Sequence, residues 1–266
     1  MGYSSSADVN RDNEGRLNEI GEDIYNNLLG QNPDDIDIND LPEYINWNNV
    51  NGYSFYPPIV NQACGNCYLI AFNSALSSRI MIWTNGGMNP DISIQQQLDC
   101  NFYTEGCDGG LPINNAKWAW EFELVDTQCY DRATNGVEGQ CINDLSGSED
   151  CITYEVENFY YVGGNYGGVS EELIMKEIVA HGPVTAVLNA PPYLQMYQGC
   201  ILEQECSNDA TEIHAHTNTD TVENSMPTFL QQTRHRISSQ SLWERGIEWE
   251  MVNHSIVIVG YGMDDT

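Results

Sequence analysis

Apolar residues recur every three or four positions over residues 67–83, and they include Phe72 and Leu76. This period matches one face of a helix and predicts helical structure over the whole stretch. The Asn-Gly-Gly sequence at 85–87 supplies a stop signal. We therefore expect a helix whose first residue is a cysteine, Cys67.

The same kinds of pattern predict further elements along the chain. Ser93 is the expected N-cap of a short helix, and Trp118, Trp120 and Phe122 are expected to form the packing face of another. Helices fill the first half of the chain and strands the second, which predicts an α+β architecture. The expected helices lie at 93–100, 114–123 and 170–180, and the expected strands at 184–188 and from 254 onward.

Two polar regions lack this periodicity. Residues 1–40 are acidic and are interrupted by Pro33, so we expect a linker or the tail of a propeptide there. Residues 207–245 are also polar, and we expect a surface loop. This loop lacks the regular spacing of metal ligands, so we expect neither a metal site nor a cofactor. Its candidate ligands are His214, His216, Asp220 and His235.

Composition limits the partners of the chain. Thirty-nine acidic residues against nine lysines and arginines give a formal net charge of -30, which repels nucleic acid and anionic membranes. The 266 residues are 41% apolar, which is ample for the core of one domain or two. No apolar run approaches the roughly 20 residues needed to span a bilayer. The first residues contain no signal-peptide core, and we expect that the sequence begins inside a longer precursor.

The chain contains nine cysteines. This number is too high for a typical reduced cytosolic protein and predicts an oxidising compartment. Because nine is odd, one cysteine remains when four disulfides have formed.

Cys67 lies where a helix favours negative charge. Unpaired N–H groups and the positive end of the helix dipole stabilise an anion there, which favours thiolate over thiol. Cys64 and Cys67 also form a Cys-x-x-Cys sequence, so a thioredoxin-like redox pair is an alternative to a nucleophile. A caspase-type site is excluded, because Asn66 breaks that pattern and the first histidine, His181, comes after the cysteine.

Two separate motifs resemble those of the papain-like cysteine peptidases. The sequence Cys-Gly-Asn-Cys-Tyr at 64–68 is similar to the nucleophile motif of that family, with Asn66 as the departure. The sequence Asn-His-Ser at 253–255, followed by Gly-Tyr-Gly at 260–262, is similar to its histidine strand. Residues 41–52, 160–168 and 196–199 resemble the cathepsin C group of the family.

The resemblance implies an α+β fold of two lobes with the active site in the cleft between them. A helical lobe at 41–155 would carry Cys67, and a β-barrel lobe at 156–266 would carry His254. His254 follows Cys67 by 187 residues, which exceeds the family spacing of about 130–150. An insertion at 207–245 accounts for most of the excess.

The same resemblance implies a cysteine-type peptidase that hydrolyses peptide bonds in peptides or proteins, in a lysosome or vacuole or after secretion. Cys67 is the expected nucleophile, His254 the base and Gln62 a donor to the developing oxyanion. The expected groove residues are Gly109, Gly110 and Asn253.

The family's disulfide pattern can be carried over to six of the cysteines. It implies that Cys67 stays free, and we add that the two remaining cysteines pair with each other. The four expected disulfides are Cys64–Cys107, Cys100–Cys141, Cys129–Cys151 and Cys200–Cys206.

The sequence departs from the family in several places. Gln62 lies five residues before Cys67, where the family has six. The Asn-Ser-Trp-Gly stretch that orients the family's histidine has no match after Gly262, so we expect a truncated barrel lobe that a missing segment or a second chain completes. An inactive pseudopeptidase that serves as a binding or structural module is therefore the alternative. Dipeptidyl action is not implied without the exclusion domain of the cathepsin C group, and Ile113 replaces a chloride-binding tyrosine.

Overall fold

The computed structural model describes residues 28–130, 137–142, 151–192, 194, 197 and 252–262. Its α-helices are α3 (Cys67–Trp83), α4 (Ile94–Cys100), α5 (Pro112–Glu121) and α6 (Glu171–His181). Short 3-10 helices are η1 (Pro33–Asp35), η2 (Ile38–Asp40), η3 (Gly106–Asp108) and η4 (Thr127–Cys129). The strands are β1 (Ile45–Asn46), β2 (Leu124–Val125), β3 (Thr153–Tyr154), β4 (Val184–Leu188), β5 (His254–Ile258) and β6 (Gly260–Tyr261).

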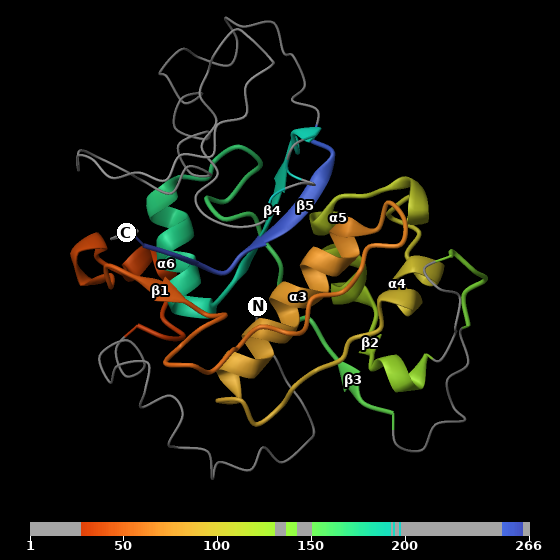
Figure 1. The fold of residues 1–266 in the computed structure, drawn as a ribbon, viewed down its shortest axis with the longest axis horizontal. Helices are drawn as coiled ribbons and strands as arrows, with labels where there is room; N and C mark the ends of the chain where they lie inside the picture. Colours follow the sequence, from red (N-terminus) through yellow and green to blue (C-terminus); the bar gives the residue numbers. More distant parts are fainter. Residues whose placement is uncertain are drawn as a thin grey trace, which may run out of the picture.

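Helix α3 lies between two groups of elements (Figure 1). On one side it packs against α4 and α5, with β2 and β3 beyond them, and on the other side it packs against β4 and β5. Because it has neighbours on both sides, apolar residues around most of its circumference are buried. This arrangement of helices on one side of α3 and a strand pair with α6 on the other gives two lobes, as expected for an α+β fold.

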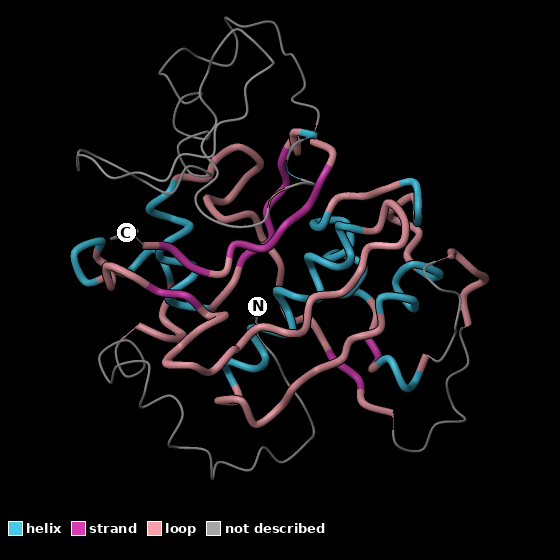
Figure 2. The backbone as a smooth tube through the Cα atoms, viewed as in Figure 1, coloured by secondary structure: helices cyan, strands magenta, loops and turns pink. Residues whose placement is uncertain are grey.

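The strands form three antiparallel pairs (Figure 2). A single residue, Val259, separates β5 from β6 and so connects two of these pairs. Strand β4 pairs with β5 along its whole length, from Val184 opposite Ile258 to Leu188 opposite His254. Strand β1 pairs with β6, and β2 pairs with β3. The β4–β5 pair therefore determines where His254 lies, because it holds this residue opposite the end of β4.

The sequence predicted several elements accurately. The predictions for α3, β4 and the start of β5 are confirmed at their stated residues. Ser93 is the N-cap of α4, because its hydroxyl accepts a hydrogen bond from the N–H of Gln96 at 3.1 Å. Ser170 likewise caps α6 by accepting from the N–H of Leu173 at 3.3 Å. These hydroxyls satisfy N–H groups that have no partner within the helix.

Helix α5 differs from the prediction. It begins at Pro112, earlier than expected, because proline fits the first turn of a helix where no N–H partner is needed. Trp118 is buried, whereas 54% of Trp120 and 43% of Phe122 are exposed. The expectation of one packing face was wrong, since residues two apart point to nearly opposite sides of a helix. Trp118 and Phe122, four apart, stack on each other instead.

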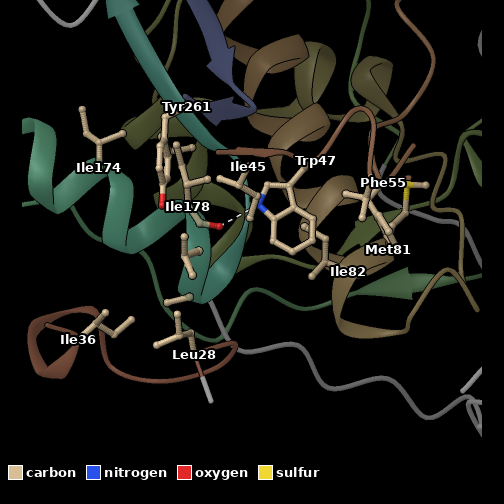
Figure 3. Packing of buried hydrophobic residues seen from close by; sticks show 14 residues of the cluster. Leu28, Ile36, Ile45, Trp47, Phe55, Met81, Ile82, Ile174, Ile178 and Tyr261 are labelled. Carbon is tan, nitrogen blue, oxygen red and sulfur yellow. Dashed lines mark hydrogen bonds between the residues drawn. The ribbon is translucent and has the colours of Figure 1, made fainter. Parts of the chain in front are cut away.

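Residues 28–40, which were expected to belong to a linker or the tail of a propeptide, pack against the lobe of α6. Leu28 and Ile36 are buried in a cluster with Ile178 of α6, and the N–H of Gly30 donates to the carbonyl of Ala180 at 2.7 Å. Figure 3 shows Leu28 and Ile36 in this cluster. Apolar burial by two residues therefore anchors a segment whose composition is mostly polar.

Trp47 occupies the centre of the same cluster. Its side chain is fully buried, and its indole N–H donates to the carbonyl of Ile178 at 2.9 Å (Figure 3). Its ring also meets Phe55 edge-on. The segment at 41–55, expected in the helical lobe, thus contributes core residues to the lobe that contains α6 and β6.

Candidate active site

Cys67 is the first residue of α3 and is half-buried. Of the seven cysteines that the structure describes, six form three disulfides and Cys67 alone is free. The three pairs are Cys64–Cys107, Cys100–Cys141 and Cys129–Cys151, which are the pairs that the family resemblance implies. The expected fourth pair, Cys200–Cys206, lies outside the described residues.

The loop before Cys67 is held by its neighbours. The Cys64–Cys107 disulfide ties it to η3, and the N–H of Gly65 donates to the carbonyl of Cys107 at 3.0 Å. A Cβ on Gly65 would meet that same carbonyl oxygen, so only glycine fits. The loop that leads into Cys67 is therefore held both by a disulfide and by a backbone hydrogen bond.

The glycine loop at 109–110 lies next to the start of α3. A Cβ on Gly110 would be 2.9 Å from side-chain atoms of both Thr104 and Tyr68, so the loop packs closely here. The Tyr68 hydroxyl donates to Thr104 Oγ1 at 3.0 Å, and burial raises the pKa of Tyr68. Gly109 has a φ of +124°, which favours glycine. Space at Gly110 and the backbone conformation at Gly109 thus both favour glycine, and Gly110 remains exposed.

His254 begins β5, and the residue before it closes the end of the β4–β5 pair. Asn253 donates from Nδ2 to Asn189 Oδ1 at 3.0 Å and accepts from the N–H of Ala190 at 2.7 Å. Its own N–H donates to the carbonyl of Leu188 at 3.0 Å. The His254 ring makes no hydrogen bond to any other residue that the structure describes.

Two contacts show how α3 runs relative to β4. Near the end of α3, Arg79 Nε donates to the carbonyl of Pro183, which directly precedes β4, at 2.9 Å. Nearer its start, the Ala71 carbonyl accepts from Thr185 Oγ1, inside β4, at 3.3 Å. Moving toward the first residue of α3 therefore corresponds to moving toward the last residue of β4.

This direction brings the two expected catalytic residues to the same end of the interface. Cys67 lies one turn beyond Ala71, or about 6 Å along the helix axis. Leu188 lies about 10 Å along β4 beyond Thr185, and Leu188 pairs with His254. Helix α3 also contacts β5 directly.

Gln62 is engaged locally. Its side-chain Nε2 donates to the carbonyl of Cys64 at 2.7 Å, and the residue is exposed. The amide that sequence reasoning assigns to an oxyanion therefore donates to the loop that precedes Cys67. The shortened spacing between Gln62 and Cys67 is consistent with this local bond.

A cavity of about 270 Å³ lies between the lobes. Its walls come from Phe72 of α3, Leu111 and Pro112 at the start of α5, and Val187 of β4. The walls are largely apolar, and the cavity begins beside the glycine loop. A larger hollow of about 440 Å³, beside Pro57, contains none of the expected site residues.

The sequence patterns do not predict a hydrogen-bonded polar cluster beside this cavity. We call it the interlobe cluster, and it consists of Arg79 on α3, Tyr160, and Glu177 and His181 on α6. Arg79, Tyr160 and Glu177 line the cavity, and 42% of Tyr160 is exposed. Arg79 and Glu177 are 98 residues apart, and their atoms NH2 and Oε1 lie 2.9 Å apart. No local sequence pattern signals such a contact, although charged residues within apolar helical stretches were a clue.

In the described part of the chain, none of the helices has the length and apolarity to cross a bilayer. The same residues contain no group of three metal-binding side chains. The loop at 207–245, with its four candidate ligands, lies outside the described residues.

Comparisons with known proteins identify relatives. Cathepsin C of Schistosoma mansoni is 29% identical over 228 residues, which are 84% of this chain and 42% of that protein. Dipeptidyl aminopeptidase 1 of Plasmodium falciparum is 23% identical, over 93% of this chain and 41% of that protein. The chain thus spans about two fifths of the length of these two relatives.

A solved structure and a family model complete the comparison. The structure of digestive procathepsin L 3 from the larval midgut of Tenebrio molitor superposes with a TM-score of 0.56 at 18% identity. The match covers 85% of this chain and 57% of that one, and it confirms the papain-like α+β fold. The model of the papain family cysteine proteases matches residues 41–222, more than half of the sequence. This chain therefore belongs to the papain family of cysteine proteases.

Proposed function

We propose that this protein is a cysteine peptidase in which Cys67 is the nucleophile and His254 the general base. One observation carries the proposal. The contacts of Arg79 and Thr185 align α3 with β4, so that the free cysteine and the histidine lie toward the same end of the lobe interface. A redox pair is not favoured, because Cys64 is bonded to Cys107 and not to Cys67.

The reaction begins with a proton transfer. The His254 imidazole accepts the proton of the Cys67 thiol, which leaves a thiolate beside an imidazolium. Cys67 is the first residue of α3, where the positive end of a helix dipole stabilises an anion. The thiolate then attacks the carbonyl carbon of the scissile peptide bond, whose π electrons move to the oxygen.

The tetrahedral intermediate collapses when the C–N bond breaks. The imidazolium gives its proton to the departing amine nitrogen, and a thioester remains on Cys67. Water then attacks the thioester, His254 takes a proton from it, and the carboxylic acid leaves as the thiol re-forms. The peptide bond has been replaced by one water, and the enzyme is regenerated.

The oxyanion needs hydrogen-bond donors. The backbone N–H of Cys67 is one, and the side chain of Gln62 is the second candidate. To act, the Gln62 amide has to exchange its bond to the Cys64 carbonyl for one to the oxyanion. Removing such a donor typically lowers the rate by about 100-fold or more.

The apolar cavity supports a choice of substrate. We place an apolar side chain of a bound peptide between Leu111 and Val187, with the peptide backbone along Gly109 and Gly110. The relatives named cathepsin C and dipeptidyl aminopeptidase favour a cathepsin C-like enzyme that acts on peptides or proteins. The three disulfides favour an oxidising or lysosomal compartment.

A further segment or a second chain would complete the second lobe. Among the described residues, β5 pairs only with β4, so its other edge has free backbone groups. Such a segment could also supply a partner for the His254 ring.

The test is alkylation of the native, non-reduced protein with iodoacetamide at a series of pH values, followed by peptide mapping. We expect Cys67 to be labelled rapidly at about pH 6, far below the pH of about 8.5 at which a free thiol ionises. His254→Ala should abolish this rapid labelling, because no base then accepts the thiol proton.

The alternative is an inactive pseudopeptidase, favoured by the local bond of Gln62. Labelling of Cys67 only under alkaline conditions, or a wild-type profile in His254→Ala, would show that the thiolate–imidazolium pair does not form. Either result would reject the peptidase mechanism and favour an inactive pseudopeptidase that serves as a binding or structural module.

A further inference from the structure

We propose that the interlobe cluster positions the nucleophile. Arg79, Glu177 and Tyr160 are positioning residues that hold α3 in a fixed rotation and translation against the strand pair β4–β5. This inference rests on the proposed function, because it concerns the alignment of Cys67 with His254. None of these residues is expected to touch the reacting atoms.

Arg79 joins both lobes through one side chain. Its Nη2 donates to Glu177 Oε1 at 2.9 Å and to the carbonyl of Gly182 at 3.4 Å. Its Nε donates to the carbonyl of Pro183 at 2.9 Å. The two carbonyls belong to the turn between α6 and β4. A residue of the nucleophile helix is thus bonded to the backbone that begins the strand paired with β5.

Glu177 completes the attachment from the other lobe. Only 3% of its side chain is exposed, and the Tyr160 hydroxyl donates to its two oxygens at 2.9 and 3.0 Å. His181 Nδ1 lies 3.1 Å from Oε1 and 3.4 Å from the Tyr160 hydroxyl. Within the described residues, the three side chains bonded to the carboxylate are therefore donors or potential cations.

The electrostatics support a charged, fixed carboxylate. Burial alone would raise the pKa of Glu177, but the His181 hydrogen bond, the charges of Arg79 and His181, and the Tyr160 hydroxyl lower it to about 2. Burial and the charge of Glu177 raise the pKa of Tyr160 to about 12. The hydroxyl therefore keeps its proton, and the carboxylate keeps its charge, over the whole range in which a peptidase works.

The interlobe cluster and Cys67 lie toward opposite ends of α3, so a small rotation of the helix at the cluster would displace Cys67. Arg79 is twelve positions along α3, or about 18 Å from Cys67 along the axis. The second fixed point is the bond from Thr185 to Ala71, close to the nucleophile. Packing against α5, β4 and β5 holds α3 between the lobes, and two separated hydrogen-bonded points add a fixed direction relative to β4. A misplacement of about 1 Å at a reacting atom can lower a rate about 100-fold.

The experiment compares Glu177→Gln with wild type in the pH profile of Cys67 alkylation. Glutamine keeps the shape of the side chain but leaves the Arg79 charge unpaired in a buried place. We expect the alkylation rate at about pH 6 to fall at least about 10-fold and the profile to move toward alkaline pH. Glu172→Gln is the matched control, since it breaks the ion pair with Lys176 on the same helix without touching α3.

A second variant and a second readout complete the design. Tyr160→Phe removes two hydrogen bonds to Glu177 without leaving a buried charge, and we expect a smaller shift, about 3-fold, in the same direction. If Glu177→Gln does not fold, Tyr160→Phe decides the question. Folded variants with the wild-type profile would overturn the inference.

The proposed function and the positioning role can fail separately. A wild-type protein without rapid labelling at about pH 6 rejects the Cys67–His254 pair. In that case hydrogen exchange over residues 67–83 and 184–188 still reports on the cluster. Faster exchange in both segments of Tyr160→Phe, but not of Glu172→Gln, supports the attachment of α3 to β4, and unchanged exchange rejects it.

Discussion

At the scale of single residues, Gly65 is required by lack of space. The carbonyl oxygen of Cys107 occupies the place of a Cβ at Gly65, and the same carbonyl accepts the N–H of Gly65. Cys107 is tied to Cys64 by a disulfide, so its backbone has little room to retreat. Any side chain at this position must push the loop that ends at Cys67.

We therefore predict that Gly65→Ala lowers the free energy of unfolding by about 1–3 kcal/mol, the usual cost of forcing an extra carbon into a packed site. It should also slow alkylation of Cys67, since the shifted loop moves the sulfur. Urea unfolding and iodoacetamide labelling measure the two effects.

Gly52→Ala is the matched control. Gly52 has a φ of +87°, but no atom lies within 4 Å of its virtual Cβ. Its replacement should cost about 1 kcal/mol from backbone strain and leave Cys67 labelling unchanged. Equal labelling in wild type and Gly65→Ala would contradict the argument from space.

Local patterns predicted where Cys67 and His254 lie, but not the contacts that hold the elements around them. Cys67 and His254 stand in motifs that can be read within ten residues, and both begin the elements that the periodicity predicts. The pairing of Arg79 with Glu177 joins residues 98 apart, which no local window contains. Likewise, the bond from Gln62 to the Cys64 carbonyl depends on loop geometry and not on residue type.

At the scale of elements, Trp47, which directly follows β1, connects this part of the chain to α6. Trp47 is fully buried, and its indole bonds to the carbonyl of Ile178. Because β1 also pairs with β6, Trp47 links the strand at the start of the fold to a helix and to the last described strand.

Trp47→Phe should lower the free energy of unfolding by about 2–4 kcal/mol. The change removes one buried hydrogen bond, worth about 1 kcal/mol, and leaves a cavity where the larger ring was. Chemical denaturation followed by far-ultraviolet circular dichroism measures the difference.

Trp83→Phe provides the comparison, because 67% of Trp83 is exposed at the end of α3. We expect its effect to stay within about 0.5 kcal/mol. A similar loss in both variants would mean that tryptophan content, and not the buried bond to α6, explains the result.

Periodicity predicted elements whose packing follows from their own sequence. Helix α3 and strand β4 carry enough apolar residues to specify their form. Residues 28–40 were expected to belong to a linker or a propeptide tail, because the few apolar residues among many polar ones give no period. The burial of Leu28 and Ile36 depends on apolar residues of α6, which are far away in the sequence and come close only when the chain has folded.

At the scale of the whole molecule, a buried charge joins the two lobes. Glu177 has a pKa of about 2 in the folded protein, against an ordinary value of 4.5. A carboxyl whose pKa is lowered by folding stabilises the protein fully above its ordinary pKa. This contribution is lost as the pH falls from about 4.5 to about 2.

We predict that wild type is more stable than Glu177→Gln at about pH 6, by on the order of 3 kcal/mol, since each pKa unit corresponds to about 1.4 kcal/mol. The difference should shrink steadily as the pH falls below 4.5. Urea unfolding of both proteins at several pH values measures it.

Glu172→Gln, with 52% of the Glu172 side chain exposed, should differ from wild type by less than about 1 kcal/mol at every pH. A constant difference between wild type and Glu177→Gln across the acidic range would contradict the linkage argument. The lower stability of Glu177→Gln would then be due to altered packing and not to the lost charge.

The burial of Leu28 and Ile36 also sets a limit on proteolytic trimming. Each contributes roughly 1.5–3 kcal/mol of apolar burial against α6. A cut before Leu28 would leave this contribution intact, whereas a cut between Ile36 and β1 would release both residues and uncover the apolar surface beneath them. Any maturation that keeps the lobe of α6 stable should therefore leave a mature amino terminus at or before Leu28.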